Sequence, residues 1–131
     1  MKESLKILFI IQWMIASAII FYLSSLPRIE FIPEEILHYD KIVHFFVYLI
    51  YGLSTHFFVF ALIKYKIVDK KTYIIAMLIA VIYAASDEFH QSFVPNRTAS
   101  FYDFLADFFG ILLSIQIFTL ILKKINRFIL K

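Results

Sequence analysis

The sequence predicts an all-α fold, an integral membrane bundle of four transmembrane helices that forms a single domain over residues 1–131. Apolar residues make up 62% of the chain and charged residues only 18%, whereas soluble domains are about 45–50% apolar and about 25% charged. The apolar residues also fall into four stretches of about 20 residues, the length that crosses a bilayer as a helix. These stretches are continuous rather than alternating, which favours helices over the strands of a membrane barrel.

The four predicted spans follow one another with short connections. They cover Ile7–Leu26, Ile42–Ile63, Thr72–Val94 and Phe101–Leu122. Lysines precede the first run, as in a signal peptide, but the run continues past its small-residue motif, so we interpret it as a retained span. The third and fourth spans each carry carboxylates in one outer third, and such groups must face the bundle interior or water.

Basic residues are distributed unequally between the two sides of this predicted bundle. Ten of the 13 Lys and Arg residues fall on the side that holds both termini and the loop between the second and third spans. Because Lys and Arg prefer cytoplasmic loops, the chain is predicted to be a multi-pass protein of the cytoplasmic membrane with both termini in the cytoplasm. This topology explains the basic pI near 9.1 without nucleic acid, so the lipid bilayer is the expected partner.

Polar side chains form stripes at the outer ends of three spans. Asp40, His44 and Tyr48 follow an i, i+4, i+8 spacing, which places them on one helix face. Similar spacings relate side chains in the third and fourth spans, and Asp87 and Asp107 both lie about 10 Å inside the predicted helix ends. The resulting candidate ligand-binding residues are Asp40, Lys41, His44, Tyr48, Asp87, Glu88, Gln91, Arg97, Asp103 and Asp107.

Negative charge is in excess in this set of residues. Five carboxylates face only Lys41 and Arg97 as fixed positive charges, and we expect Arg97 to pair with Asp87, Glu88 or Asp103. A bound divalent metal would balance the remaining charge; the candidate metal ligands are Asp87, Glu88, His44 and Asp103. Glu88 and His44 are also the candidate catalytic acid/base pair. The alternative is that the polar residues only join helices to one another.

Other polar residues have simpler interpretations. Pro95-Asn96 predicts a turn, and Ser100 followed by Asp103 resembles a capping box at the start of the fourth span. Gly110, on the same stripe as Asp107, would let a partner helix come close. His56 has no acidic neighbour in the sequence and is interpreted as a packing histidine.

Two motifs resemble the VanZ family of small bacterial membrane proteins. The first is the DK-x-x-HF element at residues 40–45, and the second is the DE-x-x-Q-x-F-x-P-x-R element at residues 87–97. The resemblance extends from about Ser24 to Ser114. Asp107 departs from it, because family members commonly carry Asn there, and a second Gly is expected near Ser114. The named member of the family is linked to resistance to the glycopeptide teicoplanin, so the resemblance implies an association with glycopeptide susceptibility.

Four functions are compatible with these features. The first is an envelope protein whose outward-facing acidic pocket binds a cell-wall precursor, a lipid-linked component or a glycopeptide. The second is a membrane-embedded enzyme that acts on a lipid-linked substrate through a metal or an acid/base pair. The third is an ion- or proton-coupled carrier that works as a homo-oligomer, and the fourth is an assembly scaffold. No phosphate-binding loop, nucleophile elbow or HExxH motif is present to favour the enzyme, so the binding function ranks first.

Overall fold

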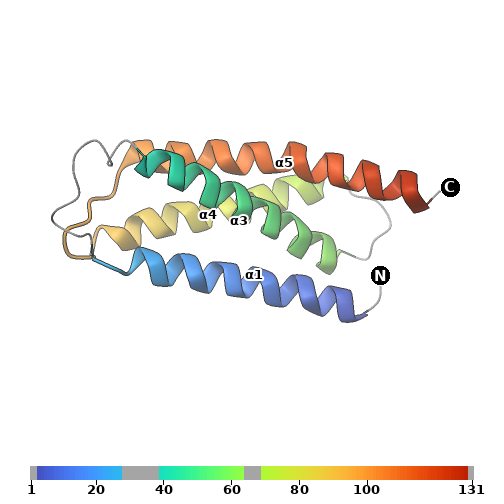
Figure 1. The fold of residues 1–131 in the computed structure, drawn as a ribbon, viewed down its shortest axis with the longest axis horizontal. Helices are drawn as coiled ribbons and strands as arrows, with labels where there is room; N and C mark the ends of the chain where they lie inside the picture. The colour runs from blue at the N-terminus through green and yellow to red at the C-terminus, as the bar shows by residue number, and fades with distance from the viewer. Residues whose placement is uncertain (1–2, 28–38, 64–68, 130–131) are drawn as a thin grey trace.

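The computed structural model describes residues 3–27, 39–63 and 69–129, with side chains described as far as residue 125. Its four helices are α1 (Glu3–Ser24), α3 (Asp40–Leu62), α4 (Lys70–Gln91) and α5 (Phe101–Ile129). They run alternately up and down, so that α1 begins and α5 ends at the same end of the bundle (Figure 1). Each is long and apolar enough to cross a membrane, which confirms the predicted fold class.

The helix ends lie within about four residues of the predicted span ends, except for the end of α5, and two of the differences have a clear physical reason. Helix α4 ends at Gln91 rather than Val94, because Pro95 disfavours a helical conformation in the residue before it. Asp87 therefore lies about 6 Å, not about 10 Å, from the end of its helix. Helix α5 begins at Phe101 as predicted but continues beyond Leu122, since the lysines that follow the apolar run are themselves good helix formers.

The connection from α4 to α5 contains the predicted turn. The amide of Arg97 donates to the carbonyl of Val94 at 3.1 Å, and Asn96 has a φ of 61°. Proline at the second position and a positive φ at the third define a type II turn, for which asparagine is one of the few suitable residues. At the other end of the bundle α4 begins with a local cap, since the Asp69 carboxylate accepts from the Thr72 amide at 3.0 Å. That hydrogen bond lowers the pKa of Asp69.

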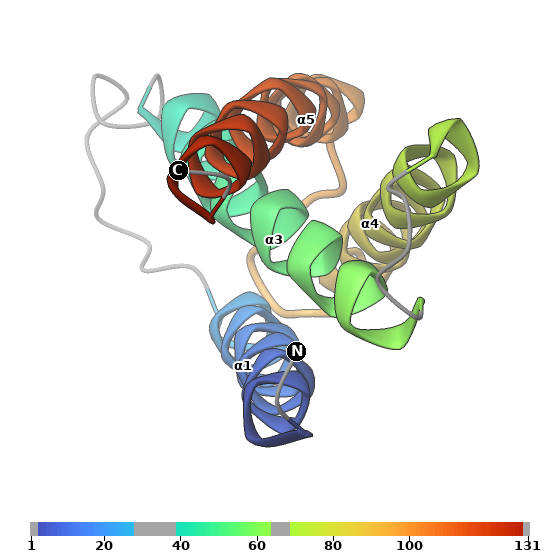
Figure 2. The same cartoon turned by 90° about the vertical axis from the view of Figure 1, so that its right-hand side faces the viewer.

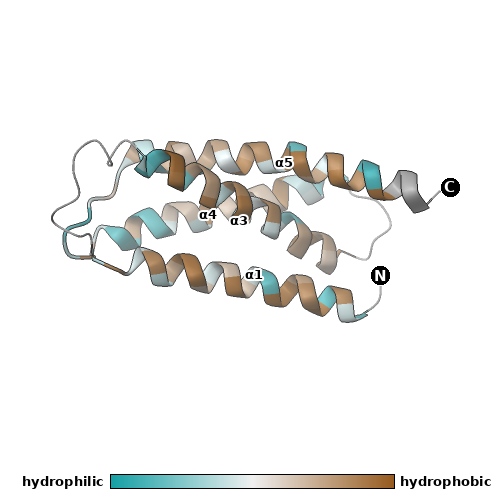
Figure 3. Ribbon diagram, viewed as in Figure 1, coloured by the Kyte–Doolittle hydropathy of each residue, from teal (hydrophilic) through white to brown (hydrophobic). Residues whose placement is uncertain are grey.

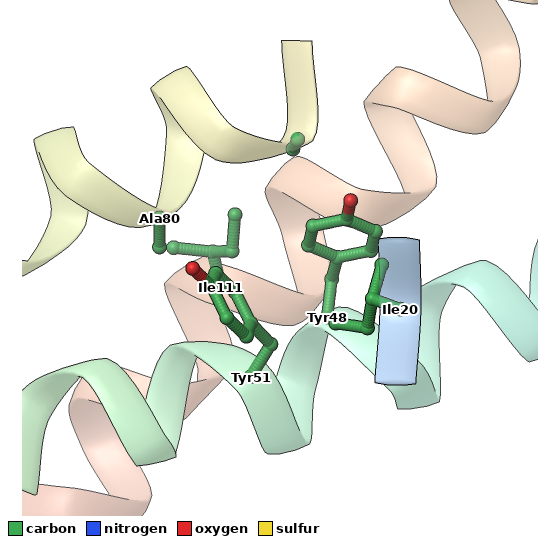
Figure 4. Close-up of a cluster of buried hydrophobic side chains, with 6 residues drawn as sticks. Ile20, Tyr48, Tyr51, Ala80 and Ile111 are labelled. Carbon is green, nitrogen blue, oxygen red and sulfur yellow. The ribbon is translucent and has the colours of Figure 1, made fainter. Parts of the chain in front are cut away.

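Helix α3 packs against each of the other three helices and lies between them in the end-on view (Figure 2). The core where they meet contains Ile20, Tyr48, Tyr51, Ala80 and Ile111, contributed by all four helices (Figure 4). Small residues occupy the buried face of α4, so its backbone comes close to the aromatic residues of α3.

Glycine permits the close contact between α3 and α5. A Cβ atom added at Gly110 would overlap the backbone carbonyl oxygen of Phe45 and lie 2.9 Å from the amide nitrogen of Leu49. At the next contact a Cβ on Gly52 would lie 2.5 Å from Ser114 Oγ. The α5 stripe that includes Gly110 therefore faces α3, which confirms that a partner helix approaches closely at this glycine.

The outer surface of the bundle is apolar along most of its length (Figure 3). Large apolar side chains project outward from every helix, among them Met14, Ile50, Ile82 and Leu120. A soluble monomer rarely exposes a continuous apolar surface of this kind, whereas a lipid bilayer would solvate it. Hydrophilic residues concentrate towards the helix ends.

Candidate functional site

The polar stripes meet at the end of the bundle where residues 92–100 connect α4 to α5, here called the hairpin end (Figure 1). Helices α3 and α5 begin at this end, and α1 and α4 end there. The polar residues involved are called the polar cluster and comprise Asp40, Lys41, His44, Tyr48, Asp87, Glu88, Gln91, Asp103 and Asp107.

His44 of α3 lies between carboxylates from two other helices. Its Nδ1 atom is 2.9 Å from Asp107 Oδ1 on α5 and 3.8 Å from Glu88 Oε1 on α4. The His44 side chain is 11% exposed and that of Asp107 is fully buried. In the tautomer that suits this contact, Nδ1–H donates to Asp107. The structure thus brings together the predicted acid/base pair of Glu88 and His44, with Asp107 as a third member.

Glu88 also closes the first turn of the neighbouring helix. Its Oε2 atom accepts from the backbone amide of Ser100 at 2.9 Å, while Ser100 Oγ accepts from the amide of Asp103 at 3.4 Å. Half of the expected capping box is therefore present, and its reciprocal bond comes from Glu88 of α4 rather than from Asp103. Asp103 Oδ1 instead pairs with Lys41 Nζ at 3.2 Å, which ties α5 to α3.

Asp87 belongs to a second line of hydrogen bonds. Its Oδ2 atom accepts from the Tyr48 hydroxyl at 3.0 Å and from the Gln91 side-chain amide at 3.1 Å. Gln91 Oε1 in turn accepts from Arg97 Nη1 at 3.1 Å. Both donors to this carboxylate are neutral. The Tyr48 hydroxyl connects Asp87 to α3, and the Gln91 amide connects it to the last turn of its own helix.

The prediction that Arg97 pairs with Asp87, Glu88 or Asp103 is wrong. Among the described residues its guanidinium pairs with no carboxylate. Instead Nε donates to the carbonyl of Leu26 at 2.9 Å and Nη2 to that of Leu23 at 3.0 Å. The last carbonyls of a helix have no partners within it, and the negative end of the helix dipole favours a cation there. Arg97 therefore fixes the end of α1 against the α4–α5 connection.

Two groups of side chains in the polar cluster have ligand atoms close enough to hold one metal ion. The first consists of His44, Glu88 and Asp107, and the second of Asp40, His44 and Asp103; in each, the ligand atoms lie within 4.8 Å of one another. The sequence-based set of metal ligands contained Asp87 and omitted Asp107. Helical spacing placed both carboxylates at similar depth, and only the rotation of α5 against α3 puts Asp107 beside the imidazole.

Some of these carboxylate oxygens lack donors. Glu88 Oε1 and Asp107 Oδ2 are buried without a hydrogen-bond partner among the described residues. An unpaired buried polar atom costs about 1–3 kcal/mol, so a bound cation or donor group would be stabilised here.

Two other histidines in the described part of the chain lie outside the polar cluster. His90 of α4 stacks on Phe21 at 4.7 Å and contacts Ser25 Oγ through Nε2 at 3.0 Å. The Ser24-Ser25 pair is typical of hydrogen bonds between helices, and the structure identifies His90 as a partner of Ser25. His56 is buried and stacks on Phe118 at 5.1 Å, in agreement with its interpretation as a packing residue.

The fold and the apolar surface define a multi-pass membrane protein of four spans with a buried carboxylate–histidine cluster at one end. The chain belongs to the VanZ/LLP1 family, whose family model matches residues 5–122, so the resemblance found from the sequence motifs is confirmed. Neither a curated protein nor a solved structure gives a significant match to the chain.

Proposed function

We propose that this VanZ/LLP1 family protein is a single-domain envelope protein that binds a polar group of a cell-wall or lipid-linked component in its polar cluster. The hairpin end faces outward in this proposal, and both termini are cytoplasmic. The charge distribution supports this orientation, because the described lysines at the opposite end include Lys6, Lys70, Lys71, Lys123 and Lys124, as the preference of basic residues for the cytoplasmic side requires.

The observation that carries the proposal is the pair of unsatisfied oxygens on Glu88 and Asp107. Packing between helices alone would favour a polar cluster whose hydrogen bonds are complete, since an incomplete one is less stable than an apolar core. A ligand with an amine or hydroxyl group would provide the absent donors. Without a bound cation, the expected ligand therefore presents hydrogen-bond donors or positive charge to the site.

The depth of the polar cluster favours a ligand that is itself anchored in the bilayer. Asp107 lies six residues after the start of α5, about 9 Å inside the helix end, near the level of lipid headgroups. Exposed aromatic side chains surround this end, namely Phe89, Phe93, Phe101 and Tyr102, each 68–70% exposed. Aromatic residues collect at the membrane interface, and here they would contact the acyl chain of a lipid-linked ligand or of teicoplanin.

Catalysis is the second candidate function. The 3.8 Å contact between Glu88 and His44 resembles a pair that moves a proton, and bound metal would add a Lewis acid. An enzyme of this type would act on a lipid-linked substrate. Homo-oligomerisation stays a prediction that accompanies either function.

Native mass spectrometry of the protein in nanodiscs tests the binding proposal. The wild type should retain a lipid-linked adduct from the producing bacterium, and Glu88→Gln, which keeps an acceptor for the Ser100 amide, should lose it. Glu3→Gln, an exposed change at the start of α1, is the matched control and should keep the adduct. Identical adducts in the wild type and Glu88→Gln would contradict the proposal. Teicoplanin susceptibility of cells that express each variant should follow adduct retention if the family association applies.

A further inference from the structure

We infer that His44, Glu88 and Asp107 bind one divalent transition-metal ion, of the Zn²⁺ or Mn²⁺ type, within the polar cluster. The inference rests on the proposed function for the location of the site, and it names the group that would hold a lipid-linked phosphate there. A metal ion polarises and binds phosphoryl oxygens, whereas carboxylates alone would repel them.

The separations between the three ligand atoms suit a common ion. In a tetrahedral site with metal–ligand bonds near 2.1 Å, ligand atoms stand roughly 3.4 Å apart. His44 Nδ1 lies 2.9 Å from Asp107 Oδ1 and 3.8 Å from Glu88 Oε1, and the three residues each offer a ligand atom within 4.8 Å of the others. Shifts of less than an ångström in these two separations would bring them to the ideal value, and the fourth position would be left for a ligand. Metal binding at Nδ1 would release the proton that Nδ1 otherwise donates to Asp107, so the imidazole would bind as its neutral form.

The unpaired oxygens are an independent indication of an ion. Asp107 is 0% exposed and Glu88 7% exposed, and each has one carboxylate oxygen without a hydrogen-bond partner among the described residues. Of the residues that the structure describes at this end, the two fixed cations are used elsewhere, since Lys41 pairs with Asp103 and Arg97 contacts backbone carbonyls. Buried carboxylates are stable when they are paired or coordinate a metal.

A hydrogen bond to the backbone fixes the orientation of Glu88. The Ser100 amide holds Glu88 Oε2 at 2.9 Å, which leaves Oε1 to face His44. Metal ligands in proteins are normally oriented by such outer contacts, which are nearly as important as the ligands themselves. Asp103, grouped with His44 and Asp40 in the adjoining set, would add negative charge beside the ion.

The donor types decide which ions the site prefers. Calcium and magnesium are usually bound by oxygen ligands alone, whereas one imidazole nitrogen with two carboxylates suits zinc, manganese or ferrous iron. The absence of cysteine from the chain also leaves no thiolate to select a softer ion.

Direct titration tests the inference. The protein, purified without a polyhistidine tag and freed of metal with a chelator, is titrated with Zn²⁺ and Mn²⁺ in detergent. About one ion should bind per chain, and Glu88→Gln or Asp107→Asn should raise Kd by more than about 100-fold. His56→Phe, which removes the other buried histidine of α3, should leave Kd unchanged. No binding by the wild type, or binding by both carboxylate variants with the wild-type Kd, would overturn the inference.

A spectroscopic measurement covers the case in which the variants fail to fold. Mn²⁺ bound to the wild type should show electron–nuclear coupling to one imidazole nitrogen, and a spectrum without nitrogen coupling would overturn the assignment. The result is separate from that of the adduct experiment. A retained lipid-linked adduct without metal binding rejects this inference alone, whereas metal binding without an adduct rejects the proposed ligand alone.

Discussion

Two histidines of α3, three helical turns apart, occupy contrasting environments. His44 lies at the hairpin end between the carboxylates of Glu88 and Asp107. His56 lies deeper in the helix, where it stacks on the ring of Phe118 and lies at a tilt to the ring of Tyr73. Neither of its ring nitrogens has a hydrogen-bond partner among the described residues. The same residue type on one helix is thus embedded in polar groups at one level and in aromatic rings at the other.

The neighbouring helices create this difference. At the level of His44, α4 and α5 contribute Glu88 and Asp107, whereas further along the same helices the buried residues that the structure describes include Ala76, Ala80 and Phe118, with only the small hydroxyl side chains of Thr72 and Ser114 as polar members. Ionisable groups at one end and apolar or small residues beyond them distinguish a candidate site from a packed core. Burial of a histidine is therefore not itself a sign of function. The residues that other helices place beside a buried histidine determine whether it can belong to a site.

The largest effect is expected from removal of Asp107. Asp107→Ala leaves His44 without its 2.9 Å partner and should lower the free energy of unfolding by about 3–5 kcal/mol, as for other buried pairs that lose one member. Asp107→Asn keeps an acceptor and should cost less than half as much. Reversible unfolding of the metal-free protein in mixed micelles gives both values. A loss below about 1 kcal/mol for Asp107→Ala would mean that the cluster is solvated and carries no special interaction.

The second largest effects are expected from alanine substitutions at the two glycines of the α3–α5 contact, and the two substitutions should destabilise the protein to different extents. Gly110→Ala places a methyl group against the backbone of α3 at Phe45, whereas in Gly52→Ala the nearest atom is the side-chain oxygen of Ser114. Overpacking costs typically about 1–3 kcal/mol, and Gly110→Ala should lie at the upper limit because a backbone cannot rotate away. The same unfolding assay checks this order, and Ser114→Ala should partly rescue Gly52→Ala but not Gly110→Ala. A reversed order would contradict the described helix contact.

Removal of the Arg97 side chain should have a smaller effect than Asp107→Ala or Gly110→Ala. Arg97→Ala removes the donors to the carbonyls of Leu23 and Leu26 and to Gln91, and partial exposure limits the loss to about 1–2 kcal/mol. Lys124→Ala, an exposed change on α5, should have no measurable effect. If Arg97 paired with Glu88, as the sequence predicts, reversal of charge in Glu88→Lys would compensate for Arg97→Glu. The contacts of Arg97 with Leu23, Leu26 and Gln91 predict no compensation in that double variant.

The smallest effect should have the opposite sign. His56→Phe removes two buried nitrogens that lack partners and keeps a ring against Phe118, so it should raise the free energy of unfolding by up to about 1 kcal/mol. The equivalent change at His44 should lower it. A strong destabilisation by His56→Phe would show that this ring has an unrecognised polar partner and would end the contrast between the two histidines.

The sequence was sufficient to predict the elements but not all of their contacts. Hydropathy and the helical repeat depend only on residues near in sequence, so the spans and the polar stripes with His44 and Asp107 could be predicted. The partners of Arg97 could not be predicted, because they are backbone carbonyls at the end of α1, and every residue type carries the same carbonyl. The capping of α5 by Glu88 likewise depends on how α4 is placed beside Ser100, which no local spacing records.

The central claim is that the polar cluster is reached from outside the cell, and cysteine labelling tests it most directly. The chain has no cysteine, so single substitutions at Thr98 in the hairpin and Lys70 at the opposite end report on one position each. With an impermeant thiol reagent, Thr98→Cys should react in intact cells, and Lys70→Cys only after the membrane is opened. Reaction of Lys70→Cys alone in intact cells would place the cluster on the cytoplasmic side and contradict the account.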